Sequence, residues 1–296
     1  MLRGHYRVVL VDRWQGEAAD LMLALHARRS AESIDRWSRE RPAAPRVVVL
    51  TGTDLYRDIQ TDADAQRSLD LADRLIVLHE RAVGDLPQQH RAKAAVCFQS
   101  AMARATLRKT ASHLRALMVG HLREVKSPGT YFEAARRLAG RSDILLDHIG
   151  EALDPLLGDE ARALRQGQPG YRWLGALPHA ATRARIQRAH VLVHPSRLEG
   201  GAHVVMEAIR SGTPVLASRI SGNVGMLGPD YAGYFEPGDA AGLATLLEHC
   251  RDRPAILQQL QVQCAARAPL FEPDRERATL LSLLNDLPND PLENPR

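Results

Sequence analysis

Short, continuously apolar runs recur along the first hundred residues of the chain and predict β-strands. They occupy positions 6–11, 21–25, 46–50, 74–78 and 94–98. Runs without polar alternation suit parallel strands that helices cover on both faces. An amphipathic stretch at 63–72 predicts one such helix. This alternation of strands and helices is typical of a parallel α/β domain.

The same alternation resumes after a polar, arginine-rich passage at 102–113. Further strands are predicted at 114–119, 144–149, 172–174, 191–194, 214–217 and 233–235, and helices at 129–138, 201–210 and 273–287. We therefore expect two doubly wound α/β domains, residues 1–105 and 106–272, with the helix at 273–287 returning to the first. The Pro/Asn/Asp-rich tail at 288–296 is expected to be disordered.

Composition narrows the class of protein. The 296 residues carry a net charge of +4 and are 45% hydrophobic, which is ordinary for a globular chain with two cores. Because basic tracts and interleaved aromatic residues are missing, we do not expect nucleic-acid binding. Three scattered cysteines show no metal or redox spacing. No apolar run approaches the roughly 18 residues of a membrane span, so we expect a soluble, cytoplasmic protein.

The most informative segment is 191–218, VLVHPSRLEGGAHVVMEAIRSGTPVLAS. It predicts a buried strand, a loop, a helix and a second strand. Gly200 and Gly201 stand where the helix begins, so a ligand can approach free backbone N–H groups that favour an anion. Glu199 and Glu207 bracket that point, and their carboxylates suit sugar hydroxyls better than phosphate. The alternative is a structural helix start with two surface glutamates.

Glu199, Glu207 and the following AIRSGTPV resemble the donor-binding signature of GT-B glycosyltransferases of the family 4 type. The resemblance implies two Rossmann-like domains facing a cleft, a nucleotide-sugar substrate, and neither metal nor cofactor. It implies that Glu207 binds the ribose and Glu199 the transferred sugar, while the backbone around Leu177 frames the nucleobase. The backbone groups expected to hold the diphosphate belong to Gly200, Gly201, Ala202 and His203.

A second match to this family lies at 119–128, VGHLREVKSP. The family usually has Gly-Arg-Leu, three residues and Lys, and both cations grip the diphosphate. Here Gly120 is followed by His121 in place of arginine, while Arg123 lies two positions later and Lys126 is in register. A cationic cluster after a strand suits pyrophosphate. A solvated charged loop is the alternative for this segment.

Polar residues also follow three predicted strands of the first half. LHARRSA, LTGTDLYRDI and CFQSA place histidine, arginine, threonine and aspartate at the strand ends where α/β sheets bind ligands. Arginines beside a helix start fit a small tetrahedral anion. His26 is open to interpretation as a base, an acceptor ligand or a structural residue, and Asp54 as an orienting group or a helix cap. The candidate acceptor-binding residues are His26, Arg28, Arg29, Thr53, Asp54 and Gln99.

LHARRSA, LTGTDLYRDI and QSA together resemble the selenosugar synthases of selenoneine biosynthesis. The resemblance implies transfer of a sugar from a UDP-sugar, chiefly UDP-N-acetylglucosamine, to selenophosphate. By this resemblance the residues that carry the reaction are Lys126, Arg123, Glu199 and His26. The alternatives are a family 4 enzyme with another acceptor, a UDP-sugar epimerase and a non-catalytic nucleotide-sugar-binding protein.

The first eleven residues, MLRGHYRVVLV, predict the end of a helix, a stop at Gly4 and then a strand. In the resembled family this passage leads from the first helix into the second strand. We therefore expect the N-terminal domain to lack its first strand and helix.

Overall fold

The computed structural model describes residues 1–287, so the predicted tail at 288–296 lies outside the described residues. The chain divides into two compact units. Unit 1 comprises Met1–Gln99 and the described part of Pro273–Arg296, and unit 2 comprises Ser100–Glu272. Each unit contains one parallel β-sheet, and this confirms the α/β class.

Unit 1 is built on a four-stranded sheet of order β1-β2-β3-β4. The strands are β1 (Met22–Leu25), β2 (Arg46–Val49), β3 (Arg74–Val77) and β4 (Ala94–Val96), and all of them run parallel. Four of the five apolar runs predicted in this half of the chain thus form strands within two residues of the expected bounds.

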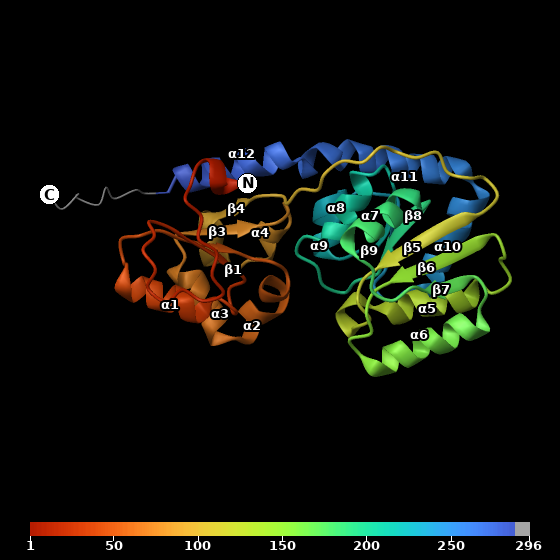
Figure 1. The fold of residues 1–296 in the computed structure, drawn as a ribbon, viewed down its shortest axis with the longest axis horizontal. Coiled ribbons are helices and arrows are strands. Elements are labelled where there is room, and N and C mark those ends of the chain that lie inside the picture. Colours follow the sequence, from red (N-terminus) through yellow and green to blue (C-terminus); the bar gives the residue numbers. More distant parts are fainter. Residues whose placement is uncertain (288–296) are drawn as a thin grey trace. The chain divides into compact units, whose positions relative to one another are not determined.

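Helices pack on both faces of this sheet because successive strand residues point to opposite sides. Val48 lies on the face covered by α1 (Ala31–Glu40) and α3 (Ala63–Leu71). Val47 and Val49 lie on the other face, against leucines of α12 (Pro273–Asn285). Figure 1 shows α12, the last described helix of the chain, back on the first sheet. The remaining elements of unit 1 are η1 (Leu2–Gly4), η2 (Asp54–Asp58), α2 (Ile59–Thr61), α4 (Ala82–Asp85) and η3 (Gln88–Lys93).

The strand predicted at 6–11 was wrong. Residues 6–11 form no strand, and the side chains of Val8 to Val11 are exposed, Leu10 at 86%. A single turn of 3₁₀-helix precedes them. An apolar, β-branched run becomes a strand only where a neighbouring strand accepts its backbone hydrogen bonds, and β1 pairs with β2 rather than with these residues.

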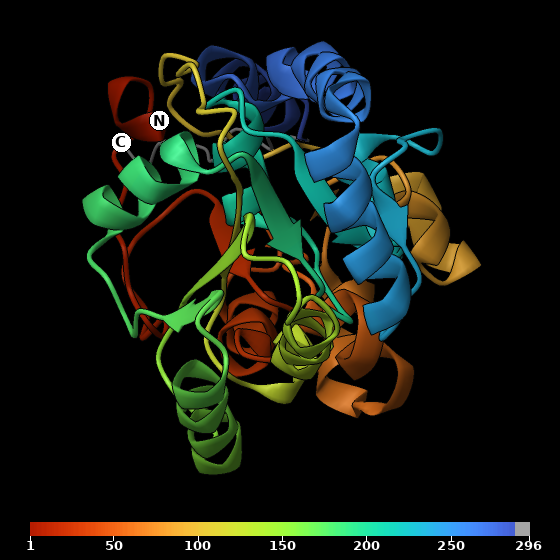
Figure 2. The same ribbon diagram turned by 90° about the vertical axis from the view of Figure 1, so that its right-hand side faces the viewer.

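Unit 2 contains a six-stranded sheet of order β10-β9-β8-β5-β6-β7. Figure 2 shows the ribbon turned by 90° from the view of Figure 1. The strands are β5 (Leu114–Val119), β6 (Ile144–Ile149), β7 (Tyr171–Trp173), β8 (Val191–His194), β9 (Val215–Ser218) and β10 (Tyr234–Phe235). The chain builds outward from β5 through β6 and β7, then crosses to the other side of β5 for β8. The carboxyl ends of β5 and β8 therefore flank the topological switch point, where open α/β sheets bind ligands.

The helices of unit 2 also divide between the two faces of the sheet. On one face α5 packs against α10, and on the other α7 packs against α8. The helices are α5 (Pro128–Arg137), α6 (Pro155–Gly167), α7 (His179–Arg188), α8 (His203–Ile209), α9 (Ser221–Leu227), α10 (Ala240–Asp252) and α11 (Pro254–Arg267), with short turns η4 (Glu124–Lys126) and η5 (Ala268–Phe271). None of the helices within residues 1–287 combines the length and apolarity of a membrane-spanning segment.

Residues 100–113, which include the arginine-rich passage at 102–113, form neither helix nor strand and belong to unit 2. The backbone N–H of Arg104 donates to the Arg210 carbonyl at 2.9 Å. Gly212 lies directly beneath Thr106: its φ is +69°, and an added Cβ would approach Thr106 Oγ1 to 2.0 Å. Glycine is therefore required here both by conformation and by space.

Candidate nucleotide-binding site

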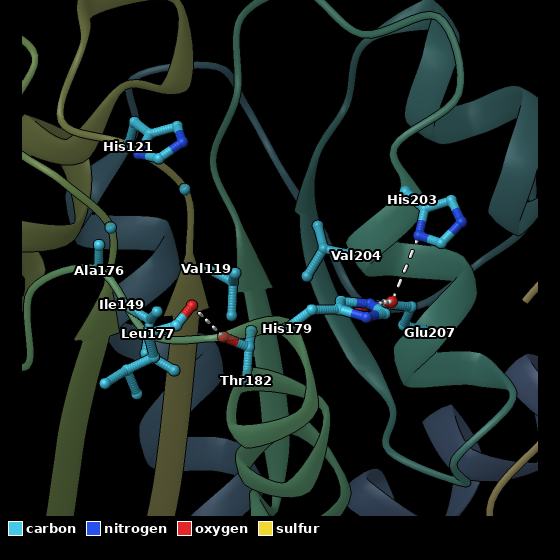
Figure 3. A pocket seen from close by; sticks show the side chains of 12 residues that line it. Val119, His121, Ile149, Ala176, Leu177, His179, Thr182, His203, Val204 and Glu207 are labelled. Atoms are coloured by element: carbon cyan, nitrogen blue, oxygen red, sulfur yellow. Dashed lines mark hydrogen bonds and ion pairs between the residues drawn. The ribbon is translucent and has the colours of Figure 1, made fainter.

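A pocket of about 310 Å³ lies in unit 2, at the carboxyl ends of its strands. Loops after β5, β6 and β7 form one side, and α7 and α8 form the other (Figure 3). Its apolar lining comes from Val119, Ile149, Ala176, Leu177 and Val204. Its polar side chains are His121, His179, Thr182, His203 and Glu207. Apolar walls with a few convergent polar groups are typical of small-molecule sites.

Glu207 is the most heavily partnered side chain of the pocket. It projects from α8 and is 4% exposed. Its Oε1 accepts from His179 Nε2 at 2.6 Å and lies 3.3 Å from His203 Nδ1 and 3.4 Å from Arg183 Nη1. Burial favours a raised pKa for Glu207, but these donors outweigh it and lower the pKa below its ordinary value. In return, Glu207 raises the pKa of His203.

Arg183 is a site residue that the sequence analysis missed. It is 5% exposed on α7, and its Nη2 donates to the Met102 carbonyl at 2.6 Å. A signal was available in the spacing, because Arg183 lies three residues before Ile186, a buried residue of α7, and so on the same face of that helix. An arginine at such a position needs a buried partner.

The structure brings Lys126 and Glu199 together although they lie 73 residues apart. Lys126, in η4, donates to Glu199 Oε1, and His194 Nε2 lies 3.4 Å from the same oxygen. Burial acts to raise the pKa of Glu199, yet His194 and Lys126 together hold it well below the ordinary value. The pair is thus a cation and a carboxylate held at the carboxyl end of β8.

The loop that carries Gly120 and His121 is held in place by contacts with the carboxyl end of β6. His148 is fully buried, which lowers its pKa to about 4 and keeps the ring neutral. Its Nε2 donates to the Gly120 carbonyl at 3.1 Å. Gly150 passes so close that an added Cβ would lie 1.9 Å from that carbonyl oxygen. His121 lines the pocket, whereas the side chain of Arg123 is exposed and outside the lining.

The loop of Gly200 and Gly201 leads into α8 two residues later than the sequence predicted. The helix begins at His203, with Ala202 as its N-cap residue. The backbone N–H of Ala202 points to Met226 Sδ at 3.3 Å. Of the predicted diphosphate-binding residues, His203 lines the pocket, whereas Gly200, Gly201 and Ala202 are outside its lining.

In unit 1, His26 follows β1 with a φ of +77° and is buried. Its Nδ1 accepts from the backbone N–H of Arg29 at 3.3 Å, so the proton lies on Nε2, which is 3.0 Å from Thr53 Oγ1. Asp54 is fully buried and accepts from the backbone N–H groups of Ala27, Thr51 and Gly52. Both ring nitrogens are engaged, and Asp54 joins the loops after β1 and β2.

The arginines predicted beside His26 differ in their surroundings. Arg28 Nε lies 3.3 Å from the buried Asp58 Oδ2, which the sequence analysis did not identify, and Arg28 Nη1 lies 3.9 Å from Asp62. Arg29 is exposed, and Gln99 is half-buried after β4. Asp58 thus balances part of the positive charge on this side of the sheet.

Neither a metal site nor a redox pair is found in the described residues. Within 1–287, no group of three or more His, Cys, Asp or Glu side chains could hold a metal ion. Cys97, Cys250 and Cys264 are free and buried. Burial raises the pKa of these thiols to about 11, about 12 and about 11, so they are unreactive at neutral pH.

The family model described as glycosyl transferases group 1 matches residues 99–259, more than half of the chain. Among solved structures, a mutant of TarM from S. aureus in complex with fondaparinux, alpha-GlcNAc-glycerol and UDP is 12% identical with a TM-score of 0.73, covering 90% of this chain and 55% of that one. Alr3699/HepE of Anabaena in complex with UDP is 16% identical with a TM-score of 0.75, covering 90% and 79%. Sucrose-phosphate synthase from Thermosynechococcus elongatus is 19% identical with a TM-score of 0.74, covering 90% and 73%.

These likenesses establish the fold. Two Rossmann-like units with parallel sheets are the GT-B arrangement, and the expected fold class is confirmed. The chain spans about half the length of TarM.

Proposed function

Because this chain belongs to the glycosyl transferases group 1 family, we propose that it transfers a sugar from a nucleotide donor that binds in the pocket of unit 2. The observation that carries the proposal is Glu207, a buried, ionised carboxylate aimed into a largely apolar pocket. Its donors among the described residues all lie on Oε1, so Oε2 is the oxygen that can accept from the two hydroxyls of a ribose.

The donor is proposed to be a UDP-sugar, chiefly UDP-N-acetylglucosamine. The structure of HepE, which has the same fold, is a complex with UDP, and this supports the choice of nucleotide. The backbone near Leu177 would meet the base, and Gly200 to His203 would meet the diphosphate. In this division of roles, residues 106–272 form the donor domain, and residues 1–105 with the helix at 273–287 form the acceptor domain.

The reaction proposed is displacement at the anomeric carbon. A lone pair on the acceptor forms the new bond to that carbon, while the bond to the diphosphate oxygen breaks and its electron pair leaves with UDP. Lys126 and Arg123 would stabilise the developing charge on the leaving group. Lys126 is paired with Glu199 before substrate binds, so we expect Glu199 to turn to the hydroxyls of the sugar as the diphosphate takes up Lys126.

The acceptor is proposed to be selenophosphate, whose selenium would form the new bond to the anomeric carbon. Water would then cleave the selenium–phosphorus bond and release phosphate, which would give a selenosugar for selenoneine biosynthesis. Arg28 and the exposed Arg29 offer positive charge to such an anion. His26 has neither nitrogen free to act as a base, and a soft, already ionised nucleophile requires none. This engagement of His26 favours an anionic acceptor over a sugar hydroxyl, which needs its proton removed.

The test is a panel of UDP-sugars against selenophosphate, thiophosphate and simple sugars, with mass detection of products and assay of released UDP. We expect a selenium-linked product with the wild-type protein and strongly reduced UDP release with Glu207→Gln and Lys126→Met. Glu236→Gln, an exposed glutamate of unit 2, and Arg188→Met, an exposed cation of α7, are the matched controls. Sugar transfer only to other acceptors contradicts the selenophosphate proposal, and interconversion of donors without an acceptor indicates an epimerase. UDP binding without turnover contradicts an enzymatic role.

A further inference from the structure

Arg183 is a permanently charged side chain buried against the carboxylate of the pocket. It is 5% exposed, and within residues 1–287 its polar contacts are Glu207 Oε1 at 3.4 Å and the Met102 carbonyl at 2.6 Å. Burying a guanidinium is unfavourable unless it is paired and hydrogen-bonded. Because Met102 belongs to the fixed passage at 100–113, the guanidinium is held from one side and presents its charge to Glu207 on the other.

The remaining donors to Glu207 are titratable. His179 reaches it from α7 and His203 from α8, and both imidazoles are well exposed, His179 at 75% for its side chain. With Arg183, these are the charged or titratable side chains that contact the Glu207 carboxylate among the described residues. An imidazole is charged only when it is protonated, and Glu207 raises the pKa of His203. The guanidinium of Arg183 stays charged throughout the neutral range.

We propose that Arg183 is a positioning residue of the nucleotide site: it holds Glu207 ionised and in place whatever the charge of the two histidines. This inference rests on the proposed function, in which the ribose is the ligand of Glu207. Arg183 itself contacts Glu207 and Met102 and does not line the pocket. Its effect therefore passes through the carboxylate.

The proposal predicts that the UDP affinity of an Arg183 variant, relative to that of the wild type, depends on pH, whereas a purely structural role for Arg183 does not predict this. Without Arg183, protonated histidines can still stabilise the buried carboxylate at low pH. As pH rises through the raised pKa of His203, the support from its charge is lost. The UDP affinity of a charge-free variant, divided by that of the wild type, should therefore fall as pH rises. Taking the ratio at each pH cancels the titration of UDP itself.

The experiment measures UDP binding by calorimetry at about pH 6 and about pH 8.5, on either side of the histidine range. The variants are Arg183→Met, Arg183→Gln, which keeps a donor for the Met102 carbonyl, and Arg183→Lys, which keeps the charge. Arg188→Met removes an exposed charge from the same helix and is the control. Circular dichroism checks that each variant is folded.

We expect the affinity of the two charge-free variants, relative to wild type, to fall about tenfold between the two pH values, as for the loss of about one pKa unit of stabilisation. The ratio for Arg183→Lys should change much less, and that for Arg188→Met should stay at one. Equal weakening at both pH values, or wild-type affinity at both, overturns the proposal. If the wild-type protein does not bind UDP, the proposed function is wrong instead.

Discussion

Replacing Gly150 by alanine should deform the pocket of unit 2 by displacing the loop of Gly120 and His121, without removing any polar side chain of the pocket. The added Cβ would lie 1.9 Å from the Gly120 carbonyl oxygen and 2.9 Å from His121 Cα. Ordinary contact begins near 3.4 Å, so the oxygen must move by about 3.4 − 1.9 = 1.5 Å. Both neighbours are backbone atoms, and a rotamer change does not relieve the contact. The same movement breaks the hydrogen bond that His148 donates to this carbonyl.

Two consequences of different size follow from this displacement. Forcing an extra methyl group into a packed position costs about 1–3 kcal/mol of folding free energy. A shift of about 1 Å in groups that position a substrate can reduce turnover about hundredfold. Because the Gly120 and His121 loop lines the pocket, we expect Gly150→Ala to lose activity well beyond its loss of stability.

The assay compares UDP release, UDP affinity and urea denaturation for Gly150→Ala and Gly129→Ala. An added Cβ at Gly129, in α5, meets no atom within 4 Å, and alanine in a helix is favourable, so this variant should keep both activity and stability. Wild-type turnover and UDP affinity in Gly150→Ala would refute the reasoning that the loop is fixed by its contact with Gly150.

Three further predictions concern stability, measured by urea denaturation. Burial lowers the pKa of His148 to about 4, so below the ordinary histidine pKa of about 6.5 the unfolded chain binds more protons than the folded one. The free energy of unfolding should therefore fall by about 3 kcal/mol as pH falls from about 6.5 to 4. An equally steep fall in His148→Leu would speak against His148 as the cause. Asp147→Asn should lower the free energy of unfolding by about 3 kcal/mol, because the buried carboxylate pairs with Arg115 and Arg172. An unchanged urea midpoint would contradict this prediction. Tyr131→Phe should cost about 1 kcal/mol, since its hydroxyl donates to backbone carbonyls of β5 and β6; a gain in stability is inconsistent with that bond.

The strands of both sheets were largely predictable because burial on two faces leaves a continuous apolar run in the sequence. Runs such as 114–119 and 144–149 became strands with those bounds. The run at 6–11 is similarly apolar but forms no strand. Apolarity therefore predicts which residues can form a strand, while pairing decides which do.

The candidate site was predictable where its chemistry is local. Glycines and glutamates around 199–207 fall within one loop and helix, so their spacing carries the signal. Arg183, His148 and Asp58 were missed, because each acts through a partner on a different element. The bonding of His26 was likewise beyond the sequence, since it depends on a backbone φ of +77° and on Thr53 from the next strand end.

The central claim is that Glu207 binds the ribose of a uridine nucleotide in the pocket of unit 2. Titration calorimetry of UDP against the wild-type protein, Glu207→Gln and the exposed control Glu236→Gln tests it most directly. We expect the wild type and Glu236→Gln to bind equally, and Glu207→Gln to bind about thirtyfold more weakly, as for loss of about 2 kcal/mol in hydrogen bonds to a charged group. Equal binding by Glu207→Gln, or no binding by the wild type, would contradict the claim.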